Sequence, residues 1–87
     1  MSERINQHTM PIVGANIRRL RKERKMKATD VFTRLQLRGI NISSGTFSKV
    51  ENGRNNPSVE MLTALTEIFQ CDYNEFFKTE QSDNYSE

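Results

Sequence analysis

The chain has 87 residues, of which 34% are hydrophobic and 28% charged, and its formal net charge is +2. This length suits one small domain, and no apolar run reaches the roughly 18 residues of a membrane span. The first ten residues lack the apolar stretch of a signal peptide, so we expect a cytoplasmic protein. The single cysteine, Cys71, has no partner for an internal disulfide, which agrees with a reducing compartment.

The charges are distributed unevenly along the sequence. Residues 1–27 hold eight basic and two acidic residues, whereas residues 60–87 hold one basic and seven acidic residues. A basic segment of this kind attracts polyanions such as nucleic acid. On composition alone, a solvated basic helix without any partner remains the alternative.

Apolar residues recur at helical spacing through the middle of the chain, and no stretch shows the alternation of a strand. This pattern predicts an all-α fold. Residues 1–10 have no sustained period, and we expect them to form a flexible N-terminal arm. We expect helices over about 11–25, 28–38, 44–52, 59–70 and 73–77, followed by a flexible acidic tail over 79–87.

Several residues mark where these helices begin and end. Ser43, Ser58 and Asp72 have side chains suited to N-caps, whereas Lys27 is a poor N-cap. Gly39 and Gly53 follow the second and third segments, where a left-handed residue commonly ends a helix.

The most informative stretch is 43–53, Ser-Ser-Gly-Thr-Phe-Ser-Lys-Val-Glu-Asn-Gly. Only Phe47 and Val50 are large and apolar, so they anchor one narrow face in a core while Ser43 caps the start. The other positions carry hydrogen-bonding side chains or none. The stretch therefore predicts a short recognition helix that the rest of the chain supports.

The block Lys49-Val50-Glu51-Asn52-Gly53, followed by Asn56-Pro57-Ser58, resembles the Cro/C1-type (XRE-like) helix-turn-helix family of transcriptional regulators. The resemblance covers residues 11–78. It implies a five-helix, lambda-repressor-like DNA-binding domain whose second and third helices form the helix-turn-helix. Residues 36–42 are several residues more than the usual tight turn, so we expect a lengthened turn before the recognition helix.

The resemblance also implies roles for individual residues on double-stranded DNA. Four residues of the recognition helix would face bases in the major groove: Ser44, Gly45, Ser48 and Lys49. Four others would face phosphates: Lys27, Thr46, Asn52 and Arg54. Ala28 stands where the family often has a phosphate-contacting glutamine, so that contact would fall to Lys27 and backbone N–H groups at the start of the helix.

Glu51 needs a separate explanation, because a carboxylate within a DNA-facing helix opposes binding unless it is neutralised. Arg21 lies beside the buried stripe of the first helix. The family pattern pairs these two residues, and we expect a partly buried ion pair between them.

These features together predict a sequence-specific DNA-binding regulator, most simply a repressor, that binds an inverted repeat as a homodimer. Phe76 and Phe77 either form the dimer surface or close the core. The alternative function is a protein-interaction module, such as an antitoxin or regulatory subunit, with a partner bound through the tail or the last helix. We expect no enzyme, cofactor or metal site, because His8 and Cys71 have no partners at a readable spacing.

Overall fold

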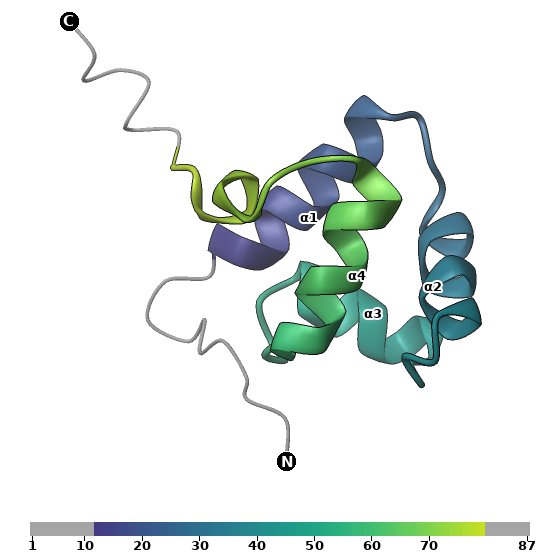
Figure 1. Ribbon diagram of the computed structural model, residues 1–87. Coiled ribbons are helices and arrows are strands. Elements are labelled where there is room, and N and C mark those ends of the chain that lie inside the picture. The colour runs from purple at the N-terminus through teal and green to yellow at the C-terminus, as the bar shows by residue number, and fades with distance from the viewer. Residues whose placement is uncertain (1–11, 80–87) are drawn as a thin grey trace, which may run out of the picture.

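The computed structural model describes residues 12–79, and every regular element within that range is helical. Its elements are α1 (Ile12–Glu23), α2 (Ala28–Leu37), α3 (Ser44–Glu51), α4 (Val59–Phe69) and the 3₁₀ helix η1 (Tyr73–Phe77) (Figure 1). The expected all-α fold is confirmed. The arm predicted over 1–10 lies outside the described residues, as does the predicted tail apart from Thr79.

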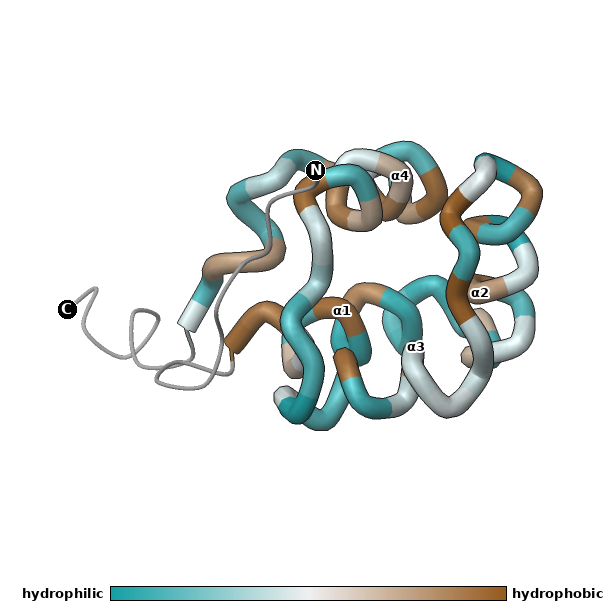
Figure 2. Tube along the Cα trace, turned by 90° about the horizontal axis from the view of Figure 1, so that it is seen from below, coloured by the Kyte–Doolittle hydropathy of each residue, from teal (hydrophilic) through white to brown (hydrophobic). Residues whose placement is uncertain are grey.

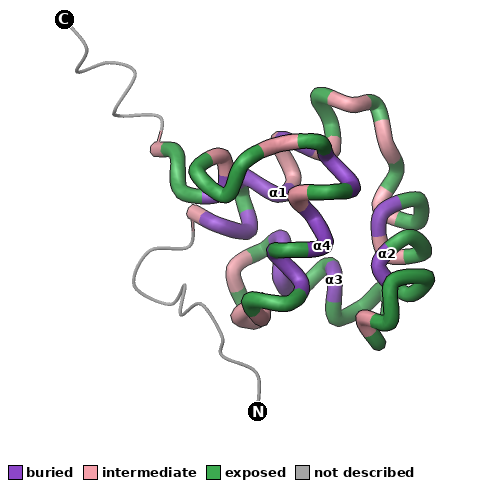
Figure 3. Tube along the Cα trace, in the orientation of Figure 1, coloured by how far each residue is buried: buried purple, intermediate pink, exposed green. Residues whose placement is uncertain are grey.

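In Figure 1, α4 lies between α1 and α2. Helix α3 packs against both α1 and α2, and η1 packs against α1 and α4. Apolar and polar segments alternate along α1, α2 and α4, as Figure 2 shows. Burial follows the same pattern, since α2 is buried where it faces α4 and exposed on its outer side (Figure 3).

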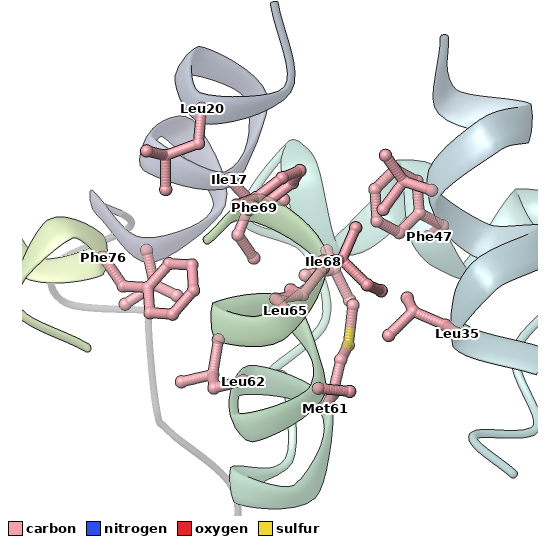
Figure 4. Close-up of a cluster of buried hydrophobic side chains, with 14 of the residues drawn as sticks. Ile17, Leu20, Leu35, Phe47, Met61, Leu62, Leu65, Ile68, Phe69 and Phe76 are labelled. Atoms are coloured by element: carbon pink, nitrogen blue, oxygen red, sulfur yellow. The ribbon is translucent and has the colours of Figure 1, made fainter. Parts of the chain in front are cut away.

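One hydrophobic core joins all five elements (Figure 4). Its largest fully buried side chains include Phe47 of α3, Phe69 of α4 and Phe76 of η1. Phe76 is therefore a core residue, whereas its neighbour Phe77 is 45% exposed. The remaining buried hydrophobic residues are Val13, Ile17, Leu20, Val31, Leu35, Ile42, Val50, Met61, Leu62, Ala64, Leu65 and Ile68.

All four α-helices are followed by a left-handed residue, and backbone N–H groups at or next to it donate to carbonyls of the last turn. In α2 the N–H of Ile40 donates to the carbonyl of Leu35 at 2.9 Å, and the N–H of Gly39 donates to that of Gln36 at 3.0 Å. Gly39 and Gly53 have φ of 85° and 81°, as their sequence positions predict.

The other two helix ends use residues that the sequence does not mark. Lys25 after α1 and Gln70 after α4 are left-handed, with φ of 56° and 57°. This conformation costs a residue with a Cβ about 1–2 kcal/mol. The first helix consequently ends at Glu23 and not near Lys25 as expected, because Met26 folds back to donate its N–H to the carbonyl of Arg21 at 3.0 Å.

The predicted N-caps are only partly confirmed. The hydroxyls of Ser43 and Ser58 accept hydrogen bonds from the N–H groups of the residues three positions on. The expected cap by Asp72 is wrong, since its side chain makes no capping hydrogen bond to η1. At α2, Lys27 has no acceptor to offer, and the carboxylate of Asp30 instead accepts from the Lys27 N–H at 2.8 Å.

A buried asparagine of α1 holds the C-terminal segment in place. The side chain of Asn16, which is 6% exposed, donates to the carbonyls of Phe76 and Lys78, each at 2.8 Å. Arg19 adds two hydrogen bonds at 3.1 Å, one to the carboxylate and one to the carbonyl of Glu75. These contacts fix η1 over one end of α1, and nothing in the helical periodicity marks Asn16 for this role.

At its other contact, α1 approaches α3 closely enough to require a glycine. A Cβ placed on Gly14 would lie 2.1 Å from the carbonyl oxygen of Val50 and 2.9 Å from that of Glu51. These are backbone atoms, which cannot rotate away. By contrast, a Cβ on Gly45 would meet nothing within 4 Å.

The two glycines therefore predict opposite effects of alanine. Gly14→Ala should destabilise the domain by about 1–3 kcal/mol, because α1 and α3 must separate. Gly45→Ala should leave stability unchanged or raise it by up to about 1 kcal/mol, because alanine favours the helix. Urea unfolding of both variants measures the difference, and equal stability of the two would contradict the close approach.

Candidate nucleic-acid interface

Helix α3 has two faces of different chemistry. Its buried residues are Phe47, Val50 and Glu51. The exposed residues of the same helix are small or polar and include one cation: Ser44, Gly45, Thr46, Ser48 and Lys49. The buried face fixes α3 to α1 and α2, so the exposed face is presented to solvent on a rigid support.

The start of α3 is held by its own cap and by the core. The Ser43 hydroxyl accepts from the Thr46 N–H at 3.2 Å and donates to the Thr46 hydroxyl at 3.1 Å. Ile42, just before the cap, is 7% exposed and belongs to the same core as Phe47. This is the arrangement expected of a hydrophobic residue before an N-cap.

The turn between α2 and α3 spans residues 38–43 and is fixed at both ends. Its first residues fold back on α2 through Gly39 and Ile40, and the side chain of Gln36 donates to the carbonyl of Ile42 at 2.7 Å. The wide turn predicted from the sequence is thus tied to α2 and to the core. Leu37, at the end of α2, is 80% exposed.

The predicted ion pair between Arg21 and Glu51 is present and joins α1 to α3. The Nε and Nη2 of Arg21 donate to the two carboxylate oxygens of Glu51 at 2.8 and 3.0 Å, and Nη1 donates to the carbonyl of Met26 at 3.2 Å. The side chain of Glu51 is only 6% exposed and that of Arg21 14%. The hydrogen bonds to Glu51 raise the pKa of Arg21 above its ordinary value, despite the opposing effect of burial.

A second arginine approaches the same carboxylate from α1. The Nε of Arg18 lies 3.6 Å from Glu51, and its Nη2 donates to the side-chain oxygen of Asn52. Two guanidinium groups therefore surround one carboxylate. The acid inside α3 is more than neutralised, and a net positive charge remains at this end of the helix.

The basic residues of the described chain fall into two groups. One group forms ion pairs: Arg18 and Arg21 with Glu51, Arg19 and Lys78 with Glu75, Arg24 with Glu23, and Arg38 with Glu67. Arg24 lies between Glu23 and the carbonyl of Phe69. Within residues 12–79, other cations form no ion pair: Lys22, Lys25, Lys27, Arg34, Lys49 and Arg54.

The eight residues predicted to face DNA are all exposed: Lys27, Ser44, Gly45, Thr46, Ser48, Lys49, Asn52 and Arg54. Seven of them lie on or shortly after α3, in residues 44–54, and Lys27 precedes the start of α2. The sequence assigns no partner to Arg18. A pattern read along the chain cannot show that it meets Asn52, which is 34 positions away.

The comparison with known families agrees with this architecture. A model of the helix-turn-helix domain family matches residues 12–76, from the first residue of α1 to the buried phenylalanine of η1. The chain belongs to this family. No curated protein and no solved structure matches the chain significantly.

No group of three or more His, Cys, Asp and Glu side chains within residues 12–79 is placed to hold a metal ion. His8 lies outside that range. None of the helices described is both long and apolar enough to cross a membrane.

The contribution of the buried ion pair can be measured against an exposed one. Glu51→Gln leaves the Arg21 charge in a buried site without its partner, and we expect a loss of about 3 kcal/mol in unfolding free energy. Glu67→Gln removes an exposed pair with Arg38 and should cost less than about 1 kcal/mol. Thermal or urea unfolding compares them, and equal losses would contradict a structural role for Glu51.

Cys71 should react slowly in the folded protein. Burial raises the pKa of its thiol above the ordinary value, with Arg24 nearby acting weakly in the opposite direction. The folded chain therefore holds less thiolate near pH 8 than the unfolded chain does. Alkylation by iodoacetamide should be slower without urea than with it, and equal rates would contradict the burial.

Proposed function

We propose that the chain is a cytoplasmic, sequence-specific regulator of transcription that binds double-stranded DNA with α3 in the major groove. The observation that carries this proposal is the composition of α3. One face is anchored in the core, and the other offers only small polar side chains and Lys49, with the exposed Arg54 shortly after the helix. A groove-binding helix needs small residues for close approach and donors for base edges.

Base recognition is assigned to Ser44, Gly45, Ser48 and Lys49. Lys49 can donate to O6 and N7 of guanine, a contact that discriminates against a wrong base by about 1–3 kcal/mol. The serine hydroxyls can donate or accept, and Gly45 permits close approach. Because three of the four residues are this small, part of the specificity is expected from the shape of the DNA.

Phosphate contacts are assigned to Lys27, Thr46, Asn52 and Arg54. The backbone N–H of Lys27 is already engaged by Asp30, so its contact depends on the ammonium group. The Thr46 hydroxyl accepts from Ser43 and can still donate its own hydrogen to a phosphate. These contacts position α3 and carry no sequence information of their own.

We also propose that the protein acts as a homodimeric repressor of the Cro/C1 type on an inverted repeat. Phe77 and Tyr73 of η1 are 45% and 47% exposed, and they are candidates for the surface that meets a second copy. A two-fold dimer places two copies of α3 about one helical turn of DNA apart. The same surface would serve a protein partner if the chain works as an interaction module.

The test is a selection of bound duplexes from random DNA, followed by affinity measurements at several salt concentrations. The affinity should fall steeply with salt, by a slope of about −0.9 per phosphate contact. Lys49→Ala should reduce the preference for the selected duplex over an unrelated one by roughly 5- to 150-fold. Lys78→Ala, which removes the same charge beside Glu75, should leave that preference unchanged.

Two results would contradict the proposal. One is a salt response that is flat for every duplex, since phosphate contacts must release counterions. The other is a Lys49→Ala protein that keeps the full preference. Recovery of a stoichiometric protein partner, together with either result, would favour the interaction module instead.

A further inference from the structure

The C-terminal end of α3 is a poor place for a phosphate unless a cation is supplied there. Asn52 is the C-cap residue, at the negative end of the helix dipole. The N–H groups of Asn52, Gly53 and Arg54 all donate back to carbonyls of α3. A phosphate at this end would find no free backbone donor and would be repelled by the dipole.

Arg18 of α1 brings a cation to this end. Its Nη2 donates to the side-chain oxygen of Asn52, and its Nε lies 3.6 Å from Glu51, too far for a strong hydrogen bond. Nη1 has no hydrogen-bond partner among the residues described, and the side chain is 42% exposed. The guanidinium is therefore oriented by protein contacts and still has donors to offer.

Arg21 lies about one helical turn further along α1 and differs from Arg18 in its hydrogen bonds and exposure. All three nitrogens of Arg21 donate to protein acceptors, and its side chain is 14% exposed. Arg21 alone neutralises Glu51 with two short hydrogen bonds. The charge of Arg18 is thus in excess of what the fold requires.

We propose that Arg18 binds a DNA backbone phosphate at the C-terminal end of α3, and that Asn52 is the positioning residue that holds its guanidinium there. The inference rests on the proposed function and deepens it, because it adds a phosphate contact from α1. It also changes the role of Asn52. A guanidinium only donates, so the Asn52 side-chain oxygen is committed to Arg18.

A forked guanidinium suits this task better than an ammonium. It can donate to Asn52 through one nitrogen and to phosphate oxygens through the others, in fixed geometry. Holding one edge of the group on Asn52 also lowers the entropy lost when the phosphate binds. The α1 helix, docked on α3 through Gly14 and Glu51, would then be part of the DNA interface as well as its support.

The experiment compares five variants on the duplex selected from random DNA and on an unrelated duplex, at several salt concentrations. Arg18→Gln should weaken binding to both duplexes by a similar factor, roughly tenfold, and make the salt slope shallower by about 0.9. Arg18→Lys should restore the slope, since the charge returns, with only part of the affinity. Lys78→Gln serves as the charge control and should change neither.

The Asn52→Ala substitution is made in the wild-type protein and in the Arg18→Gln protein. Asn52→Ala should weaken binding when Arg18 is present and should add little in the Arg18→Gln protein, because the two residues act as one unit. Equal and independent losses would overturn the positioning role. The melting temperature of each variant shows whether weaker binding comes from a less stable fold or from a lost contact. If Arg18→Gln is less stable, the salt slope of Arg18→Lys decides whether the charge of Arg18 contacts a phosphate.

Two outcomes separate the role of Arg18 from DNA binding by α3. Wild-type affinity and slope in Arg18→Gln, with lost preference in Lys49→Ala, would overturn the role of Arg18 and leave DNA binding by α3 standing. Absence of salt-dependent binding in the wild-type protein would overturn both.

Discussion

The buried ion pair between Arg21 and Glu51 is the contact on which the presentation of α3 depends. It joins the only acid of α3 to α1, at the place where Gly14 lets the two helices approach to backbone contact. A buried pair of this kind does not by itself guarantee high stability, because both charges lose their hydration. Its value lies in geometry, since a bidentate pair accepts one relative orientation of α1 and α3 and removes a negative charge from a surface that would meet phosphates.

Other contacts also hold α3 in place and leave positive charge on the surface. Phe47 and Val50, on the same buried face of α3 as Glu51, fix the helix in the core, and the turn after α2 is held by the hydrogen bond from Gln36 to Ile42. Acidic residues of η1 and α4 form ion pairs with Arg19 and Arg38. The described cations without an ion pair lie elsewhere on the surface, including on α3 and in the residues after it. The nearly neutral chain thereby keeps a locally basic surface, which is the quantity that matters for binding a polyanion.

Much of the fold follows from local signals in the sequence. The helical periodicity and the residues Ser43, Ser58, Gly39 and Gly53 predict the helices and most of their ends, because caps and left-handed glycines act within a few residues. Lys25 and Gln70 are not predictable in this way, since tertiary packing imposes a conformation that their own chemistry disfavours. The contacts of Asn16 with η1 and of Arg18 with Asn52 join residues 34 or more positions apart, and no local pattern encodes such pairs. For the site, the sequence and the family resemblance together single out α3 and the pair Arg21–Glu51, whereas the surplus charge of Arg18 becomes visible only in three dimensions.

The central claim is that the exposed face of α3 binds DNA, and its most direct test is a titration of isotopically labelled protein with the selected duplex, followed by NMR. The largest changes in amide signals should fall on residues 44–54, with the side-chain Nε signal of Arg18 shifting as well. Changes concentrated on α4 and η1, with the signals of α3 unmoved by a duplex that binds, would contradict the account.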